Sequence, residues 1–186
     1  MSSYEKNHYD EVFKRMVKSF QPCNCVELGV LDGYSTAAIA DGLQFNGRGI
    51  VKGYDLFEDY EFNHKNYDDI KKKFEGNQYV EIIKKDAFSV HEEYGNRSVD
   101  LLHVDLSNDG SIVRRIMEQW NDKMVHGGLI LFEGGSEERD NIEWMKKYNK
   151  EPIKPELEKN LIIKDSVYVF CTYLKFPSLT VLLRKS

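Results

Sequence analysis

The chain has 186 residues, of which 41% are hydrophobic and 31% are charged, so we expect one globular domain over residues 1–186. Its net charge of -5 argues against general binding to nucleic acid or to an anionic membrane, because both favour a basic surface. Three cysteines cannot form a closed disulfide framework. The N-terminus lacks the apolar core of a signal peptide, and no apolar stretch approaches the ~18 residues of a membrane span. Together these features predict a soluble cytoplasmic protein.

The first predicted element is an amphipathic helix near the N-terminus. Apolar residues recur at helical spacing from Tyr9 to Phe20, and Pro22 should end the helix. We expect residues 1–21 to form a helical cap on the domain.

Strand-like runs and helical segments then alternate along most of the chain. The strand-like runs are residues 25–28, 50–54, 79–83, 99–104 and 129–132. The helical segments between and after them include residues 62–74, an apolar stripe from Ile112 to Met124, and residues 137–148. Residues 147–160, which contain two prolines, are expected to be a connection. This alternation implies right-handed crossovers and a parallel sheet that helices cover on both faces.

The C-terminus breaks the alternation. The runs "VYVFCTYL" and "LTVLLRK" both have the composition of strands, and only "KFPS" separates them. That connection is too short for a crossover helix, so the two strands should pair antiparallel. We therefore predict an α/β fold with a Rossmann-like, doubly wound sheet of seven strands, mostly parallel, with an antiparallel C-terminal hairpin.

The segment "VELGVLDGYST", residues 26–36, follows directly from the first predicted strand. Ligands of open parallel sheets bind at the carboxyl ends of the strands, where this segment lies. Gly29 and Gly33 allow the backbone to approach a ligand closely. The nucleotide patterns GxGxxG and GxxxxGK[ST] are absent, and the carboxylate of Glu27 would repel phosphate. We therefore expect a ligand with a positive charge at this point, such as an ammonium or a sulfonium group.

With Glu27, Gly29 and Gly33 in the pattern acidic-x-G-x-x-x-G, the chain resembles the class I S-adenosylmethionine-dependent methyltransferases. Acidic residues also stand at the ends of the next three predicted strands, namely Asp55, Asp86 and Asp105. The resemblance implies that S-adenosyl-L-methionine is the cofactor. The implied cofactor site comprises Glu27, Gly29, Val30, Gly33, Ser35, Asp55, Leu56, Asp86, Ala87 and Asp105.

The resemblance also implies a role for each later acid. Asp55 would accept hydrogen bonds from the ribose hydroxyls, which suits a carboxylate because its two oxygens can serve two neighbouring hydroxyls. Asp86 would accept from the adenine amino group, and Asp105 would lie where the methyl group meets its acceptor. From the residues alone, Asp55 is also compatible with a simple turn, and Asp86 with the N-cap of the following helix.

The stretch from "DLLHVD" to "GGLILFE" resembles small-molecule O-methyltransferases, which implies a small-molecule acceptor with a hydroxyl group. Asp105 and Glu133 are the implied catalytic residues, while His103 is expected to be a buried, hydrogen-bonded histidine. Catechol-type relatives hold magnesium with an Asp after the fourth strand and an Asp-Asn pair after the fifth. Asp105 and Glu133 could supply two carboxylates, but Gly134 stands where Asn would be. A requirement for magnesium is left open.

Two other functions are compatible with the sequence. The first is an oxidoreductase that uses NAD on a related sheet, against which Glu27 and the missing third glycine argue. The second is a protein that binds S-adenosylmethionine without transferring its methyl group. That alternative rests on "LSNDG" after Asp105, where the small-molecule group commonly has "GDHSY". Neither the acceptor nor a homodimer can be decided from the sequence.

Overall fold

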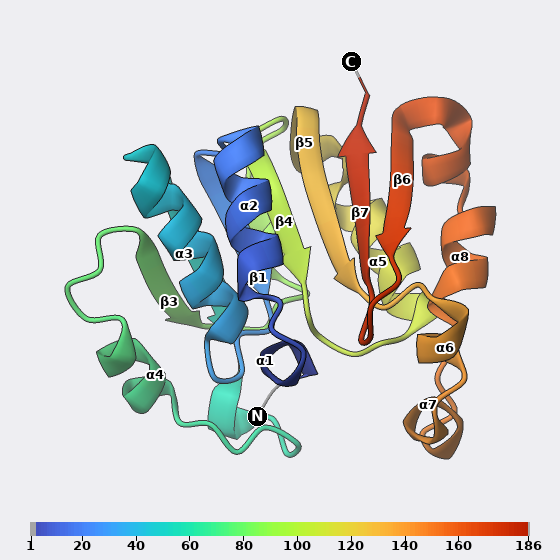
Figure 1. Ribbon diagram of the computed structural model, residues 1–186, viewed down its shortest axis with the longest axis horizontal. Coiled ribbons are helices and arrows are strands. Elements are labelled where there is room, and N and C mark those ends of the chain that lie inside the picture. Colours follow the sequence, from blue (N-terminus) through green and yellow to red (C-terminus); the bar gives the residue numbers. More distant parts are fainter. Residues whose placement is uncertain (1–2, 186) are drawn as a thin grey trace. The chain divides into compact units, whose positions relative to one another are not determined.

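The computed structural model describes residues 3–185, and the chain divides into two compact units, Met1–Glu93 and Tyr94–Ser186 (Figure 1). Within the described residues, no helix combines the length and the apolar character that crossing a membrane requires. The assignment of residues 1–186 to one domain stays a prediction.

The first unit contains three parallel strands in the order β3-β2-β1. The strands are β1 (Asn24–Leu28), β2 (Ile50–Asp55) and β3 (Val80–Lys84). Its helical elements are α1 (Ser3–Lys6), α2 (Asp10–Phe20), α3 (Tyr34–Asn46), η1 (Phe57–Asp59), α4 (Tyr67–Lys73) and η2 (Val90–Glu93). The three predicted strands are confirmed. Because the strands are parallel, Glu27 and Asp55 both lie toward the carboxyl edge of this sheet.

The predicted N-terminal helix is confirmed as α2, which lies beside α3 in Figure 1. The side-chain amide of Asn46 donates to the carbonyl of Val17 at 2.9 Å, and the helices also share an ion pair. α2 ends at Phe20 because Gln21 takes the left-handed conformation, with φ of 50°, and Pro22 follows. These contacts join α2 to the C-terminal part of α3.

The second unit contains four strands in the order β4-β5-β7-β6, and Figure 1 shows β7 between β5 and β6. The strands are β4 (Val99–Val104), β5 (Met124–Glu133), β6 (Tyr168–Tyr173) and β7 (Leu179–Arg184). The helical elements are α5 (Gly110–Trp120), η3 (Asn121–Lys123), α6 (Glu137–Asp140), α7 (Glu143–Lys147), α8 (Ile153–Lys159) and η4 (Ile163–Val167). β4 and β5 are parallel, whereas β7 runs antiparallel to β5 and β6. The predicted C-terminal hairpin is therefore confirmed.

One helix begins later than its apolar pattern predicts. The helix expected over residues 62–74 starts only at Tyr67. Asn66 has an extended backbone, and its side-chain oxygen accepts from the backbone nitrogens of Asp68 and Asp69 at 3.0 and 3.3 Å. This N-cap starts the helix at that point, as asparagine commonly does.

Three further expectations in the second unit were wrong. The helix predicted over residues 137–148 is divided into α6 and α7, because Ile142 is extended with ψ of 153°. Met124 begins β5 instead of ending the apolar stripe of α5. The segment 147–160, expected to be a connection, contains the helix α8. The apolar pattern located these segments but not the turns within them.

Candidate functional site

The turn after β1 is shaped by backbone conformations that glycine adopts readily. Gly29 and Gly33 have φ of 88° and 74°, in the left-handed region that disfavours side chains. A Cβ on Gly33 would also lie 2.6 Å from the ring of Phe74, which closes the outer side of the turn. The backbone nitrogen of Gly29 donates to the carbonyl of Tyr54 at 2.9 Å, so the turn continues the pairing of β1 with β2.

Glu27 lies at this turn with no exposed surface. The hydroxyl of Ser35 donates to its Oε1 at 2.5 Å, and the hydroxyl of Thr36 donates to its Oε2. Both hydroxyls come from the first turn of α3, so they point back toward the end of β1. The sequence analysis placed Ser35 in the cofactor site, and in the structure its hydroxyl binds Glu27. Together these residues form a buried carboxylate held in one orientation.

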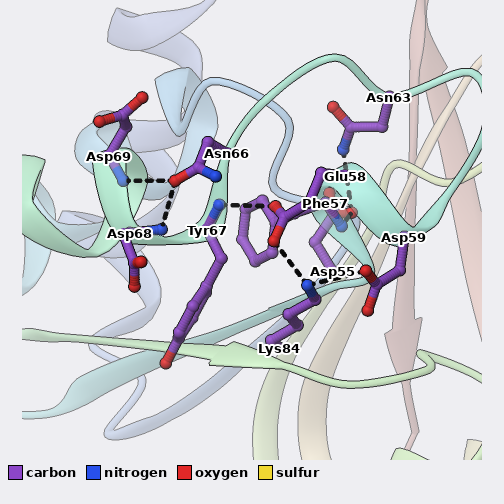
Figure 2. Close-up of polar contacts among 10 residues, drawn as sticks. All are labelled: Asp55, Phe57, Glu58, Asp59, Asn63, Asn66, Tyr67, Asp68, Asp69 and Lys84. Atoms are coloured by element: carbon purple, nitrogen blue, oxygen red, sulfur yellow. Dashed lines mark hydrogen bonds and ion pairs between the residues drawn. The ribbon is translucent and has the colours of Figure 1, made fainter.

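Asp55, at the end of β2, ties the turn to the next strand. Its Oδ2 accepts from the backbone nitrogens of Val30 and Leu31 at 2.8 and 2.9 Å. Its Oδ1 accepts from the backbone nitrogen of Phe57 at 2.8 Å and from the amide of Asn63 at 3.0 Å, and Figure 2 shows both partners. A carboxylate offers about four lone pairs, so these four donors satisfy it. Val30 also packs its side chain into an apolar cluster with Phe57, Ile70, Phe74 and Ile82.

An ion-pair network holds the segment after Asp55 (Figure 2). Lys84 of β3 binds Glu58 at 2.6 Å and Asp59 at 2.9 Å, and the backbone nitrogen of Tyr67 donates to Glu58 at 2.8 Å. The hydrogen bond from Lys84 is the main cause that lowers the pKa of Glu58 to about 2. The network joins β3, η1 and α4, and sequence reasoning missed both Lys84 and Asn63.

The remaining predicted cofactor residues surround the same edge of the first unit. Asp86 is exposed two residues beyond β3, and its Oδ1 accepts from the backbone nitrogen of Phe88 at 3.0 Å. This is a local turn contact: the next helical element, η2, begins only at Val90, so Asp86 is not its N-cap. Ala87 is buried, and Leu56 is half-buried directly after Asp55.

In the second unit, Asp105 is half-buried just after β4, and His103 is fully buried within that strand. Asp105 lines a cavity of about 10 Å³, roughly the space of one water molecule. Other polar residues of this cavity are Ser107, Asn108, Asp109 and Glu133. Asp109 caps α5, since its Oδ1 accepts from the backbone nitrogen of Ser111 at 2.9 Å.

Glu133, at the end of β5, forms an ion pair that sequence reasoning did not predict. Nη2 of Arg139 donates to Oε1 of Glu133 at 2.8 Å, and the side chains are only 10% and 6% exposed. The backbone nitrogen of Arg139 donates to the hydroxyl of Ser136, which caps α6, and its guanidinium lies 5.7 Å from the ring centre of Phe176. Glu133 is therefore paired with a fixed positive charge.

The space around Gly134 leaves no room for a larger residue directly after Glu133. Its φ is 99°, and a Cβ there would lie 2.7 Å from Oδ1 of Asn108 and 3.0 Å from Ile153. Oδ1 of Asn108 is itself buried and has no hydrogen-bond partner among the described residues. Asn108 therefore occupies the space into which a side chain at position 134 would extend.

These residues do not fit a magnesium site. Magnesium requires a near-octahedral set of oxygen ligands and usually keeps several waters. Here Glu133 is bound to a cation, the Asn of the catechol-type pair is replaced by Gly134, and the cavity holds about one water. Among residues 3–185, no group of three or more His, Cys, Asp or Glu side chains is arranged to hold a metal ion.

Comparison with known proteins gives one family match. A family model described as "Methyltransferase domain" (Methyltransf_24) matches residues 26–133, which is more than half of the chain. This range begins within β1 and ends at Glu133, the last residue of β5. A search of curated proteins found no match.

Solved structures with a similar fold cover nearly the whole chain. An SAH-bound methyltransferase, PaMTH1 from Podospora anserina, has 16% identity and a TM-score of 0.71, over 100% of this chain and 80% of that protein. A methyltransferase from Geobacter sulfurreducens has 14% identity and a TM-score of 0.69, over 96% and 79%. An SAH-bound O-methyltransferase from Bacillus cereus has 16% identity and a TM-score of 0.67, over 96% and 81%. At these identities the likeness concerns the fold, and it confirms the predicted Rossmann-like α/β class.

Proposed function

We propose that this chain, which belongs to the methyltransferase-domain family matched over residues 26–133, methylates a hydroxyl group of a small molecule. It is a methyltransferase of the class I, S-adenosylmethionine-dependent fold. The donor is S-adenosyl-L-methionine. The observation that carries this proposal is the buried carboxylate of Glu27 beside Gly29 and Gly33. A negative charge at that position suits the ammonium of the donor and opposes a pyrophosphate.

The donor half of the proposed site belongs to the first unit. Glu27, with the backbone of Gly29, Val30 and Gly33, would face the amino-acid end of the donor, and Ser35 would orient Glu27. To bind the ribose, Asp55 would have to give up one of its present hydrogen bonds. The side-chain amide of Asn63 is the partner that can turn away most easily, because the other three donors are backbone nitrogens. We propose that Leu56, Asp86 and Ala87 surround the adenine.

The acceptor half belongs to the second unit and contains Asp105 and Glu133. In the transfer, the acceptor oxygen attacks the methyl carbon while the carbon–sulfur bond breaks, and the sulfur keeps the electron pair as a neutral thioether. We propose that Asp105 takes the hydroxyl proton. Alignment of the three reacting atoms can supply roughly 7–11 kcal/mol of the acceleration, so the chain needs to supply little further chemistry.

Calorimetric titration and a labelled-methyl assay test this proposal. The chain should bind S-adenosylmethionine and S-adenosylhomocysteine but not NAD, and it should transfer labelled methyl to a member of a panel of small hydroxyl compounds. Binding of NAD in place of the donor would support an oxidoreductase. Donor binding without transfer to hydroxyl, amine, thiol or carboxylate compounds would support a binding protein and contradict the proposed activity.

A further inference from the structure

We infer that the Arg139 guanidinium is the fixed cation of the acceptor half, where it pairs with Glu133 in place of a divalent metal ion. Methyl transfer by this chain would then be independent of divalent metals. This inference rests on the proposed function. Cation binding can nevertheless be measured in the absence of methyl donor and acceptor.

The positive charge of Arg139 opposes the binding of a metal ion at Glu133. Nη2 of Arg139 lies 2.8 Å from Oε1 of Glu133, whereas a magnesium ion would need to lie ~2 Å from a carboxylate oxygen. Arginine keeps its proton at every ordinary pH, so the two cations would repel each other in a place that excludes most of the solvent. For a metal to bind Oε1 of Glu133, Arg139 would have to leave a buried ion pair, which strands a buried charge.

Arg139 is held in place at its backbone and at its guanidinium. Its backbone nitrogen donates to the hydroxyl of Ser136 at 3.1 Å, and its guanidinium lies over the ring of Phe176. The guanidinium is thus a built part of the site and not a surface side chain that happens to meet Glu133.

The cavity beside Glu133 is small and contains an acceptor that lacks a hydrogen-bond partner among residues 3–185. The cavity beside Glu133 has a volume of about 10 Å³, which accepts one water or one hydroxyl but not a metal ion with its water ligands. Oδ1 of Asn108, which lines this cavity, is buried without a partner among residues 3–185. The site therefore needs a hydrogen-bond donor at this point, and a water or the acceptor hydroxyl would provide it.

The test uses manganese as a paramagnetic probe for a magnesium-type site. Electron paramagnetic resonance should detect no saturable Mn²⁺ binding to the purified full chain, and dialysis against EDTA should leave its thermal unfolding and its affinity for S-adenosylhomocysteine unchanged. Saturable Mn²⁺ binding that is lost in Glu133→Gln would overturn the inference. Loss of donor binding in the untreated chain would instead count against the proposed function, so the two failures are distinguishable.

Substitution of Arg139 provides the second part of the test. Arg139→Gln frees Glu133 and replaces the arginine by a shorter polar side chain, and we expect saturable Mn²⁺ binding to appear in this variant. Arg15→Gln is the matched control, because it removes an exposed arginine that pairs with Glu11. The double variant Glu133→Gln/Arg139→Gln buries no unpaired charge at this point and should lose this Mn²⁺ binding. An Arg139→Gln chain that folds but shows no saturable Mn²⁺ binding would refute the role of Arg139.

Discussion

The backbone nitrogen of Val30 donates to Oδ2 of Asp55 at 2.8 Å, so the turn after β1 is held by the acid at the end of β2. The same carboxylate accepts from three other donors. A residue expected to contact the ribose thus also shapes the turn that we propose to face the amino-acid end of the donor. Donor binding and local stability should therefore depend on the same side chain.

Asp55→Asn should lower both the stability and the donor affinity of the chain. An asparagine side chain has one oxygen and one NH₂ group, and either orientation would place its NH₂ group against two of the donors around Asp55. We expect a loss of ~1–3 kcal/mol in the free energy of unfolding, measured by urea denaturation. Affinity for S-adenosylhomocysteine should fall by at least tenfold in calorimetry.

Asp69→Asn is the control for this substitution, because Asp69 is exposed on α4. It should change neither quantity by more than the error of the measurements. If Asp55→Asn behaved like this control, Asp55 would have neither of the two roles.

Thr36→Val should reveal how strongly the buried Glu27 depends on its hydroxyl partners. Valine keeps the shape of threonine but removes the donor to Oε2 of Glu27. Hydrogen bonds to a charged group contribute ~1.5–3 kcal/mol, compared with ~0.5–1.5 kcal/mol for a neutral pair. The comparison is Thr172→Val, which removes a neutral bond to the hydroxyl of Thr180. Urea denaturation should show the larger loss for Thr36→Val, and equal losses would argue against a charged Glu27.

Gly33→Ala should destabilise the chain more than Gly47→Ala. The two glycines have nearly the same φ, 74° and 70°, so an alanine at either position carries a similar backbone strain. A Cβ at position 33 would meet the ring of Phe74, whereas nothing lies within 4 Å of one at position 47. The steric term should add ~1–3 kcal/mol to the loss at position 33, measured by denaturation. Phe74→Leu should recover part of that difference, and no recovery would place the strain elsewhere.

The pairing of Glu58 with Lys84 should make part of the stability depend on pH. The pKa of Glu58 is lowered from 4.5 to about 2 in the folded chain. The stabilisation is therefore complete above the unfolded value of 4.5 and is lost as the pH falls toward 2. Glu58→Gln should lower the melting temperature near about pH 7 but much less near about pH 3. A difference that stays constant over this range would show that the ion pair is not the cause.

The local structure around the site residues was easier to predict from the sequence in the first unit than in the second unit. Glu27 and Asp55 lie at the carboxyl ends of strands that the sequence indicated, and the glycine turn between β1 and α3 is a local feature that depends on nearby residues. The cofactor roles expected for these residues stay predictions. The internal hydrogen bonds of Asp55 are compatible with a role in cofactor binding, but they do not test that role.

The contacts that join distant parts of the chain could not be predicted in this way. Lys84 meets Glu58 only because β3 pairs with β2, and neither residue carries a motif. Arg139 meets Glu133 because Gly134 and Gly135, both with positive φ, turn the chain back after β5. The one available signal was that Arg139 is the single basic residue within "EGGSEERD".

Asp105→Asn should slow methyl transfer without weakening donor binding. Asp105 lines the cavity that also contains Asn108 and Glu133, and we propose that it accepts the proton of the acceptor hydroxyl. Loss of a general base typically costs ~10²–10⁴-fold in rate, so kcat should fall by at least about 100-fold. Calorimetry with S-adenosylhomocysteine should give an unchanged affinity. Glu118→Gln, an exposed substitution on α5, is the control for a general effect of removing one negative charge. Full turnover in Asp105→Asn with unchanged donor affinity would remove Asp105 from the mechanism and leave alignment alone as the source of the rate.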